Sequence, residues 1–327
     1  MFKKLFTYLL CFITLISTAL FTSCKKNEVV NVYVVDGAPL LSVCNLLDKN
    51  EINGVEIKVN VVDGVDALVG TIGRKEADVA VCPINVASTL YNGGVDFKLL
   101  SVNVFGVLKI LSKQNATLVD LKGKTVYNIG AGGTPDVTLK YILTANNIEY
   151  TENLSTPNAD KVNLKYVSSA SDLIPLLKTG VAEFGVLGEP AVTKAVNVAK
   201  VSPIISLTEE WTKLHNYSYT QAGVCVSEDL LKKDKKFVKE LYLELEKSYS
   251  YAINSVENLK TLLSENGSSL QIDFTKSVID ACNLNCKNAY ALKNDIEKYL
   301  TVLKNYNLKS IGGKLPDNSF YLDYENL

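Results

Sequence analysis

The chain has 327 residues, 47% of them apolar, which is enough to bury a full core in one or two domains. Its 34 basic and 35 acidic side chains nearly balance, and without a basic stripe we expect no nucleic-acid partner. The only histidine is His215, and the cysteines lack zinc-site spacing, so we expect no metal and no cofactor. Cys282 and Cys286, four residues apart, are interpreted as buried neighbours on one helix face, with a disulfide as the alternative.

The N-terminus has the pattern of an export signal. Lys3 and Lys4 precede an apolar run over residues 5–16, and small residues follow it. We expect residues 1–23 to be a signal peptide. The alternative is an uncleaved membrane anchor, because residues 5–21 form a stretch of 17, at the lower limit of the roughly 17–25 needed to span a bilayer.

The end of this segment, residues 21–24 (FTSC), resembles a bacterial lipobox. In that motif the cysteine is lipidated and becomes the new N-terminus, although Phe21 departs from the usual leucine. We therefore expect a lipid on Cys24 and a tether over residues 24–28. The body of the protein would then lie outside the cytoplasm as a monomer, anchored to the cell membrane and facing the periplasm or the exterior.

Beyond the tether, strands alternate with helices, which is typical of a parallel sheet in an α/β fold. The first elements are predicted as a strand at 29–35, a helix from Pro39 through 47, a strand at 55–62, a helix at 66–73 and a strand at 78–81. The long apolar stretch at 97–111 is interpreted as a crossing to a second unit.

The second unit begins the same alternation again. Its strands are predicted at 125–129, 165–168 and 184–187, and its helices at 134–145, 173–178 and 189–198. The apolar strand 222–226 is expected to cross back, and the chain is mostly helical from Glu228 onward, with further helices near 275–281 and 291–306.

An internal repeat relates the two units. Residues 77–88 (ADVAVCPINVAS) are echoed by residues 182–193 (AEFGVLGEPAVT), which lie 105 positions later. Two copies of one α/β unit predict two similar lobes with a cleft between them. We expect one lobe to comprise 29–108 and 225–327 and the other 109–224, with hinges at 107–111 and 222–226.

The richest local motif is residues 130–135 (GAGGTP), between a strand and a helix. A nucleotide-binding GxGxxG needs glycine where Pro135 stands, so that interpretation fails. The motif predicts a tight turn in which Thr134 caps the helix and Pro135 takes its first position. Because glycines admit a ligand close to the backbone, and a helix N-terminus is partly positive, Gly132, Gly133 and Thr134 are candidate ligand contacts.

Residues 36–39 (DGAP) are the counterpart of this motif in the first unit. Ala38 has no side-chain oxygen and is a poor N-cap, so either solvent or a ligand must satisfy the helix N–H groups. We therefore include Asp36, Gly37 and Pro39 among the candidate ligand contacts.

Asn85 and Glu189 follow matching strands of the repeat, where open α/β sheets place their ligands. Each could instead stabilise the start of its own helix. A Glu189 carboxylate facing the cleft would favour a ligand with N–H or O–H donors, with an ammonium group or a metal ion as the alternative.

Aromatic residues gather before the return crossing, where Trp211 and Tyr219 flank His215 and Tyr217. Trp211 and Tyr219 are candidates for stacking on a ligand ring, and packing in the hinge is the alternative. With one histidine in this setting, no Ser/His/Asp set has support and we expect no catalytic residues.

Four segments together resemble one known family: residues 36–39 (DGAP), 123–126 (GKTV), 130–136 (GAGGTPD) and 188–191 (GEPA). They resemble solute-binding proteins of ABC importers of the nitrate, sulfonate and thiamine-precursor type. The resemblance implies the type II periplasmic binding protein fold, with two α/β lobes, two hinge strands and a ligand between the lobes. It implies ligand contacts from the loops around Pro39, Asn85, Thr134 and Glu189.

The resemblance also implies a function. We expect a membrane-tethered binding protein that passes a small molecule to the transmembrane subunits of an ABC permease and makes no bond. Helix N-termini favour a sulfonate-like anion, whereas Glu189 and the aromatic residues favour a nitrogen heterocycle such as a vitamin precursor, which we prefer. The alternatives are an exported enzyme on the same fold and a ligand-sensing module for a membrane receptor.

Overall fold

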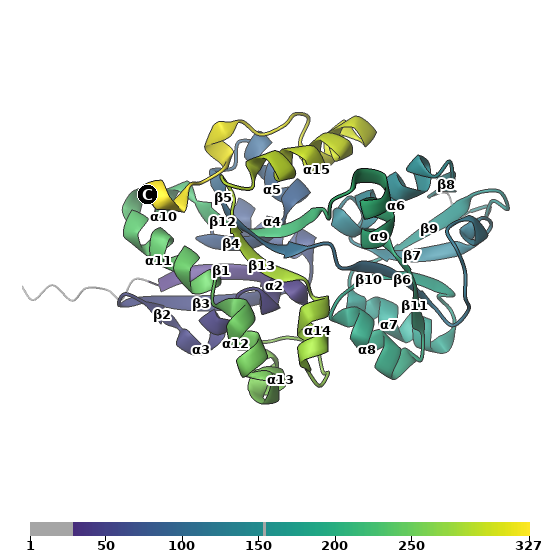
Figure 1. Cartoon of the computed structure of the whole chain (residues 1–327), viewed down its shortest axis with the longest axis horizontal. Helices are drawn as coiled ribbons and strands as arrows, with labels where there is room; N and C mark the ends of the chain where they lie inside the picture. The colour runs from purple at the N-terminus through teal and green to yellow at the C-terminus, as the bar shows by residue number, and fades with distance from the viewer. Residues whose placement is uncertain (1–28, 153–154) are drawn as a thin grey trace, which may run out of the picture.

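The computed structural model describes residues 29–152 and 155–327, so the predicted signal peptide, Cys24 and the tether lie outside the described residues. Two β-sheets, each covered by helices, form two lobes that lie side by side (Figure 1). The first sheet has the strand order β13 (Leu284–Asn288), β5 (Phe97–Phe105), β12 (Thr220–Ser227), β4 (Val79–Pro83), β1 (Val29–Val35), β3 (Val55–Val62) and β2 (Glu51–Ile52).

The first lobe has parallel strands at its centre. β1 pairs in parallel with both β3 and β4, and β12, β5 and β13 continue the sheet as antiparallel neighbours. Val30, Val32 and Val34 are buried in β1, which agrees with the predicted strand. Its helices are α2 (Ala38–Leu41), α3 (Cys44–Lys49), α4 (Val65–Gly73), α5 (Ile84–Asn92), α10 (Glu228–Lys233), α11 (Lys235–Leu245), α12 (Ser248–Asn254), α13 (Val256–Glu265), α14 (Lys276–Ala281) and α15 (Lys293–Tyr306).

The second lobe repeats this plan on a smaller sheet. Its strand order is β11 (Ser202–Ser206), β6 (Leu108–Ser112), β10 (Phe184–Gly188), β7 (Thr125–Ile129), β9 (Val162–Val167) and β8 (Tyr150–Thr151). Its helices are α6 (Thr134–Ala145), α7 (Ala170–Thr179), α8 (Ala191–Ala199) and α9 (Leu207–His215). The repeat is confirmed, because β10 begins 105 residues after β4 and each of the two strands leads into a helix.

The chain passes between the lobes at two short linkers, residues 106–107 and residues 216–219. These differ from the hinges predicted at 107–111 and 222–226. The stretch 97–111 is two strands in different sheets, β5 and β6, separated by Gly106 and Val107. The predicted return boundary at 224/225 falls inside β12, which pairs with β4 and β5 from Thr220 onward. The apolar strand 222–226 is therefore an inner strand of the first sheet, between β5 and β4, and not a crossing.

The two linkers contact each other. The Gly106 N–H donates to the Tyr219 carbonyl at 3.1 Å, and the Val107 N–H donates to Gln221 Oε1 at 3.1 Å. A Cβ on Gly106 would lie 2.7 Å from Thr208 Oγ1 and 2.8 Å from Tyr219 Cε1, so a larger residue here would clash with these two side chains.

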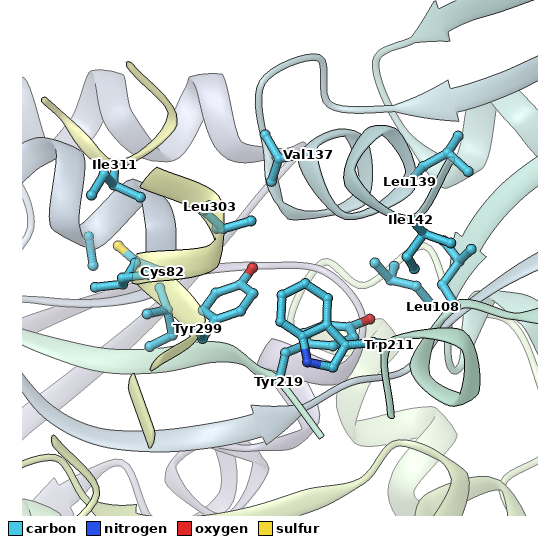
Figure 2. Close-up of a cluster of buried hydrophobic side chains, with 14 of the residues drawn as sticks. Cys82, Leu108, Val137, Leu139, Ile142, Trp211, Tyr219, Tyr299, Leu303 and Ile311 are labelled. Atoms are coloured by element: carbon cyan, nitrogen blue, oxygen red, sulfur yellow. The ribbon is translucent and has the colours of Figure 1, made fainter. Parts of the chain in front are cut away.

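One apolar cluster continues from the first lobe into the second (Figure 2). Cys82 comes from β4, Ile142 from α6 and Trp211 from α9, and Tyr299 of α15 lies between Cys82 and Trp211 in the figure. Helix α15 extends from the first lobe towards α6 (Figure 1) and contacts it. The lobes therefore share a core along this side.

Two further features concern cysteine and the membrane. The five cysteines in the described part of the chain are free. Cys282 follows α14 and Cys286 lies in β13, so the predicted shared helix face is wrong. Among residues 29–152 and 155–327, none of the helices combines the length and apolar character needed to cross a bilayer.

Candidate functional site

A cavity of about 190 Å³ lies between the lobes. It is bounded by the carboxyl ends of β1, β3 and β4 and by the loops that follow β7, β9 and β10, where α/β sheets place their ligands. Its walls are largely aliphatic, from Val35, Val81, Val107, Leu108 and Ile129 among others. The described residues that line it include no aromatic, lysine, arginine or histidine side chain.

Two helices with uncapped N-termini begin at this cavity. α4 follows Gly64 and α6 follows Gly133, and neither has a side-chain cap. Gly64 has φ of 120°, a conformation that a residue with a side chain rarely adopts. At α4 the first-turn N–H groups and the helix dipole favour a hydrogen-bond acceptor or an anion. At α6 Pro135 has no N–H and the Asp136 N–H donates to the Gly133 carbonyl at 3.1 Å, so the Thr134 N–H is the remaining backbone donor of that first turn.

The glycine loop before α6 is held by a buried carboxylate. Asp136 Oδ2 accepts from the Gly132 N–H at 2.8 Å and from Lys140 Nζ at 2.9 Å, and Oδ1 accepts from the Tyr166 hydroxyl at 2.9 Å. Burial alone would lower the pKa of Lys140, but its bonds to Glu152, Tyr166 and Asp136 raise that pKa above its ordinary value. The loop therefore has a fixed shape.

The predicted cap at α6 is wrong. Gly133 occupies the N-cap, Thr134 is the first helical residue and Pro135 the second. Thr134 lies inside the helix and makes no capping bond, and its hydroxyl donates to Asn85 Oδ1 at 2.9 Å. Thr134 and Gly133 still line the cavity.

Asp36 lines the cavity but its carboxylate is already occupied. Oδ1 accepts from the Gly37 N–H at 2.9 Å and the Ser268 hydroxyl at 2.7 Å, and Oδ2 accepts from the N–H and hydroxyl of Ser269, both at 2.8 Å. Pro39 is the second residue of α2, whose N-cap is Gly37. Asp36 therefore anchors a distant segment beside the cavity.

That segment, Ser268–Leu270, reaches the second lobe. The Ser269 carbonyl accepts from Lys194 Nζ at 2.6 Å, and the Ser269 hydroxyl lies 3.1 Å from that of Ser171. Leu270 is buried in an apolar cluster otherwise formed by the second lobe, with Leu173 and Leu187 among its members. Ser269 and Leu270 line the cavity, and no local motif marked them in the sequence.

Glu189 lines the cavity as a compensated charge. Its carboxylate is buried and lies 3.0 Å from Lys109 Nζ. Its other oxygen accepts from the N–H and hydroxyl of Thr193, at 3.1 and 2.9 Å, in the first turn of α8. The alternative role of stabilising its own helix therefore accounts for Oε2, and the ion pair with Lys109 accounts for Oε1.

The remaining predicted residues lie elsewhere. Trp211 and Tyr219 are fully buried in the shared core and do not line the cavity, so stacking on a ligand ring there is wrong. Their ring centroids lie 5.3 Å apart, and Trp211 also packs against Tyr299 at 5.4 Å. Asn85 and Gly132 line a larger neighbouring groove instead of the cavity.

Sequence reasoning missed the loops after the second strand of each unit. Residues 62–65 and 168–171 line the cavity from opposite lobes. The internal repeat carried this signal, because both loops follow equivalent strands and precede α4 and α7. Within the described residues, no three His, Cys, Asp or Glu side chains gather as a metal site.

Solved structures resemble this architecture, although no protein-family model and no curated protein sequence matches the chain. An ABC transporter protein from Parabacteroides distasonis is 24% identical with a TM-score of 0.74, over 90% of this chain and 99% of that one. The periplasmic aliphatic sulphonate binding protein SsuA from Escherichia coli is 14% identical with a TM-score of 0.63, over 90% and 99%. The chain has the periplasmic binding protein fold.

The periplasmic nitrate-binding protein NrtA from Synechocystis PCC 6803 has the same fold, with 15% identity and a TM-score of 0.58 over 86% of this chain and 82% of that one. The predicted fold class is therefore confirmed. These neighbours are binding proteins for a sulphonate or nitrate, and the Parabacteroides protein is an ABC transporter component. In a periplasmic binding protein fold, the cavity between the lobes is the natural candidate site.

Proposed function

We propose that this protein is an extracytoplasmic, lipid-anchored solute-binding protein of an ABC importer. Its ligand would be a small aliphatic molecule with an anionic head group, such as an alkanesulfonate. The observation that carries the proposal is the cavity itself: aliphatic walls from both lobes combine with the uncapped N-termini of α4 and α6. The similarity of the fold to sulphonate- and nitrate-binding proteins supports the same ligand class.

Three carboxylates of the described residues line the cavity; two of them are already paired within the protein, and the third, Asp63, is exposed. Glu189 is paired with Lys109, and Asp36 is satisfied by its own chain, so neither needs a cationic ligand. The preference for a heterocycle rested on Glu189, whose carboxylate is paired with Lys109, and on Trp211 and Tyr219, which are buried away from the cavity. Aliphatic walls accommodate an alkyl chain through burial of apolar surface.

Binding accounts for the site better than catalysis. The hydroxyls lining the cavity, from Ser168, Ser169, Ser171, Ser269 and Thr134, have no lysine or histidine among the described lining residues to act as a base. His215 lies outside the cavity and contacts the Tyr141 hydroxyl through Nε2 at 2.9 Å. A ligand touching both lobes would favour the closed arrangement, with hinge motion at the linkers of residues 106–107 and 216–219.

Native mass spectrometry of residues 25–327, followed by thermal-shift titration, tests the proposal. The probes are ethanesulfonate, longer alkanesulfonates, nitrate, a pyrimidine and a flavin. We expect a rise in melting temperature with alkanesulfonates. Stabilisation by the pyrimidine or flavin alone would overturn the ligand class, and chemical conversion of a probe would overturn the binding function.

A pair of variants ties any shift to the cavity. Ala170 lines the cavity, so Ala170→Phe fills it, whereas Ala131 lines only the larger neighbouring groove. We expect Ala170→Phe to abolish the thermal shift and Ala131→Phe to preserve it. Equal shifts in both variants would place binding outside the cavity.

A further inference from the structure

Asn85 joins the two lobes by direct hydrogen bonds. It lies in the first turn of α5 in the first lobe, and only 1% of its surface is exposed. Its Oδ1 accepts from Thr134 Oγ1 at 2.9 Å, and its Nδ2 donates to the Gly132 carbonyl at 3.3 Å. Both partners belong to the second lobe.

The same amide also holds the C-terminal segment. Nδ2 donates to the Ser310 carbonyl at 3.3 Å, so both amide hydrogens and the oxygen have partners. Thr89, one turn later on α5, donates to that same carbonyl at 3.3 Å. Asn85 is therefore the point at which the first lobe, the second lobe and the 3₁₀ helix η2 (Leu308–Ile311) meet.

The two partners of Asn85 in the second lobe belong to the loop that lines the cavity. Gly133 and Thr134 face the cavity, while the Gly132 carbonyl and the Thr134 hydroxyl are bonded to Asn85. Asp136 fixes the same loop from within the second lobe through the Gly132 N–H. Gly132 therefore donates its N–H within the second lobe and accepts through its carbonyl from the first lobe.

We propose that Asn85 is a positioning residue that latches the two lobes and fixes the glycine loop against the cavity. It does so by accepting from the side chain of Thr134 and donating to the backbone of Gly132. Separating the lobes breaks both bonds and exposes the buried amide, so the latch favours the arrangement with the lobes in contact. This goes beyond the proposed function and requires no particular ligand.

Pulsed-EPR distances between the lobes test the latch without added ligand. Spin labels on Lys58→Cys in β3 and Lys178→Cys in α7 report the separation, in a Cys286→Ser background because Cys286 is the partly exposed thiol among the described cysteines. Each hydrogen bond lost should raise the ratio of separated to contacting lobes about fivefold. We expect Thr134→Val to lengthen the distances, and Asn85→Ala to lengthen them further.

Asn92→Ala is the matched control. Asn92 also lies on α5 and donates to the C-terminal segment, to the carbonyls of Ile311 and Lys314 at 2.9 and 2.6 Å, but it has no bond to the second lobe. We expect it to lower the melting temperature while leaving the distance distribution unchanged.

The near-isosteric Thr134→Val keeps the test decisive if Asn85→Ala does not fold. Unchanged distances in Thr134→Val and in a folded Asn85→Ala would overturn the proposal. So would an equal lengthening in Asn92→Ala, because packing of the C-terminal segment, and not the bonds between lobes, would then hold the lobes together. Failure to find a ligand would leave this result unaffected.

Discussion

Lys109 Nζ lies 3.0 Å from Glu189 Oε1, and this ion pair joins β6 to the residue that follows β10 beside the cavity. The Glu189 side chain is 4% exposed and that of Lys109 is 29% exposed, so the carboxylate is the desolvated partner. A carboxylate buried in this way needs its cation, because without it a charge remains in a region of low dielectric.

Lys109→Met should therefore destabilise the fold. We expect a loss of about 2–4 kcal/mol in the free energy of unfolding, measured by urea denaturation, because the Glu189 carboxylate keeps only Thr193 as a partner. Lys124→Met is the control. Its partner Glu183 is 36% exposed, and the loss should stay below about 1 kcal/mol. Equal losses in the two variants would contradict the assigned role of Lys109.

Asp36→Ala should release the segment Ser268–Leu270. The variant removes the acceptor for the Ser269 N–H, which donates at 2.8 Å. Because hydrogen bonds to a charged group contribute about 1.5–3 kcal/mol, amide exchange at Ser269 should accelerate at least tenfold. Hydrogen-exchange mass spectrometry measures this. Asp273→Ala, in the same stretch of chain but with a side chain 92% exposed, should leave the rate unchanged.

Acid should destabilise the protein partly through His215. Burial lowers the pKa of His215, so the unfolded chain binds a proton more readily than the folded one. The contribution of neutral His215 to stability is complete above its unfolded pKa of about 6.5 and is lost as the pH falls below that value.

A single-histidine chain makes this directly measurable. We expect the drop in melting temperature between pH 7.5 and 5.5 to be smaller in His215→Gln than in the unaltered protein. An NMR titration of untagged protein follows one imidazole. A folded-state pKa at or above the ordinary value would contradict the expectation.

Trp211→Ala should act on stability because Trp211 belongs to the shared core. Removing a fully buried tryptophan costs about 3–5 kcal/mol, through lost apolar burial and the cavity left behind. Leu214→Ala, on the same helix but 38% exposed, should cost well under half as much. Chemical denaturation compares the two. A mild effect of Trp211→Ala would return that side chain to the list of candidate ligand contacts.

Local patterns were sufficient for the elements and for the division into two units. The strands 29–35, 55–62 and 125–129 and the helix 134–145 have the predicted bounds, because apolar runs, glycine and proline act on neighbouring residues. The repeat 105 residues apart indicated two lobes and placed their loops at one edge. Neither the apolar patterns nor the repeat predicted which way the side chains at that edge point.

Tertiary structure decided which polar groups are free. Asp36 bonds to Ser269, 233 residues away, and Asn85 bonds to Thr134, 49 residues away. Neither the Asp36 carboxylate nor the Asn85 side-chain amide is therefore left for a ligand. Trp211 and Tyr219 fit a ring-binding site or a core equally well in sequence, and both are buried against Tyr299 of α15. The sequence by itself predicted two α/β lobes with a cleft between them. Long-range contacts decided which atoms face that site, because buried donors and acceptors pair wherever the fold brings them together.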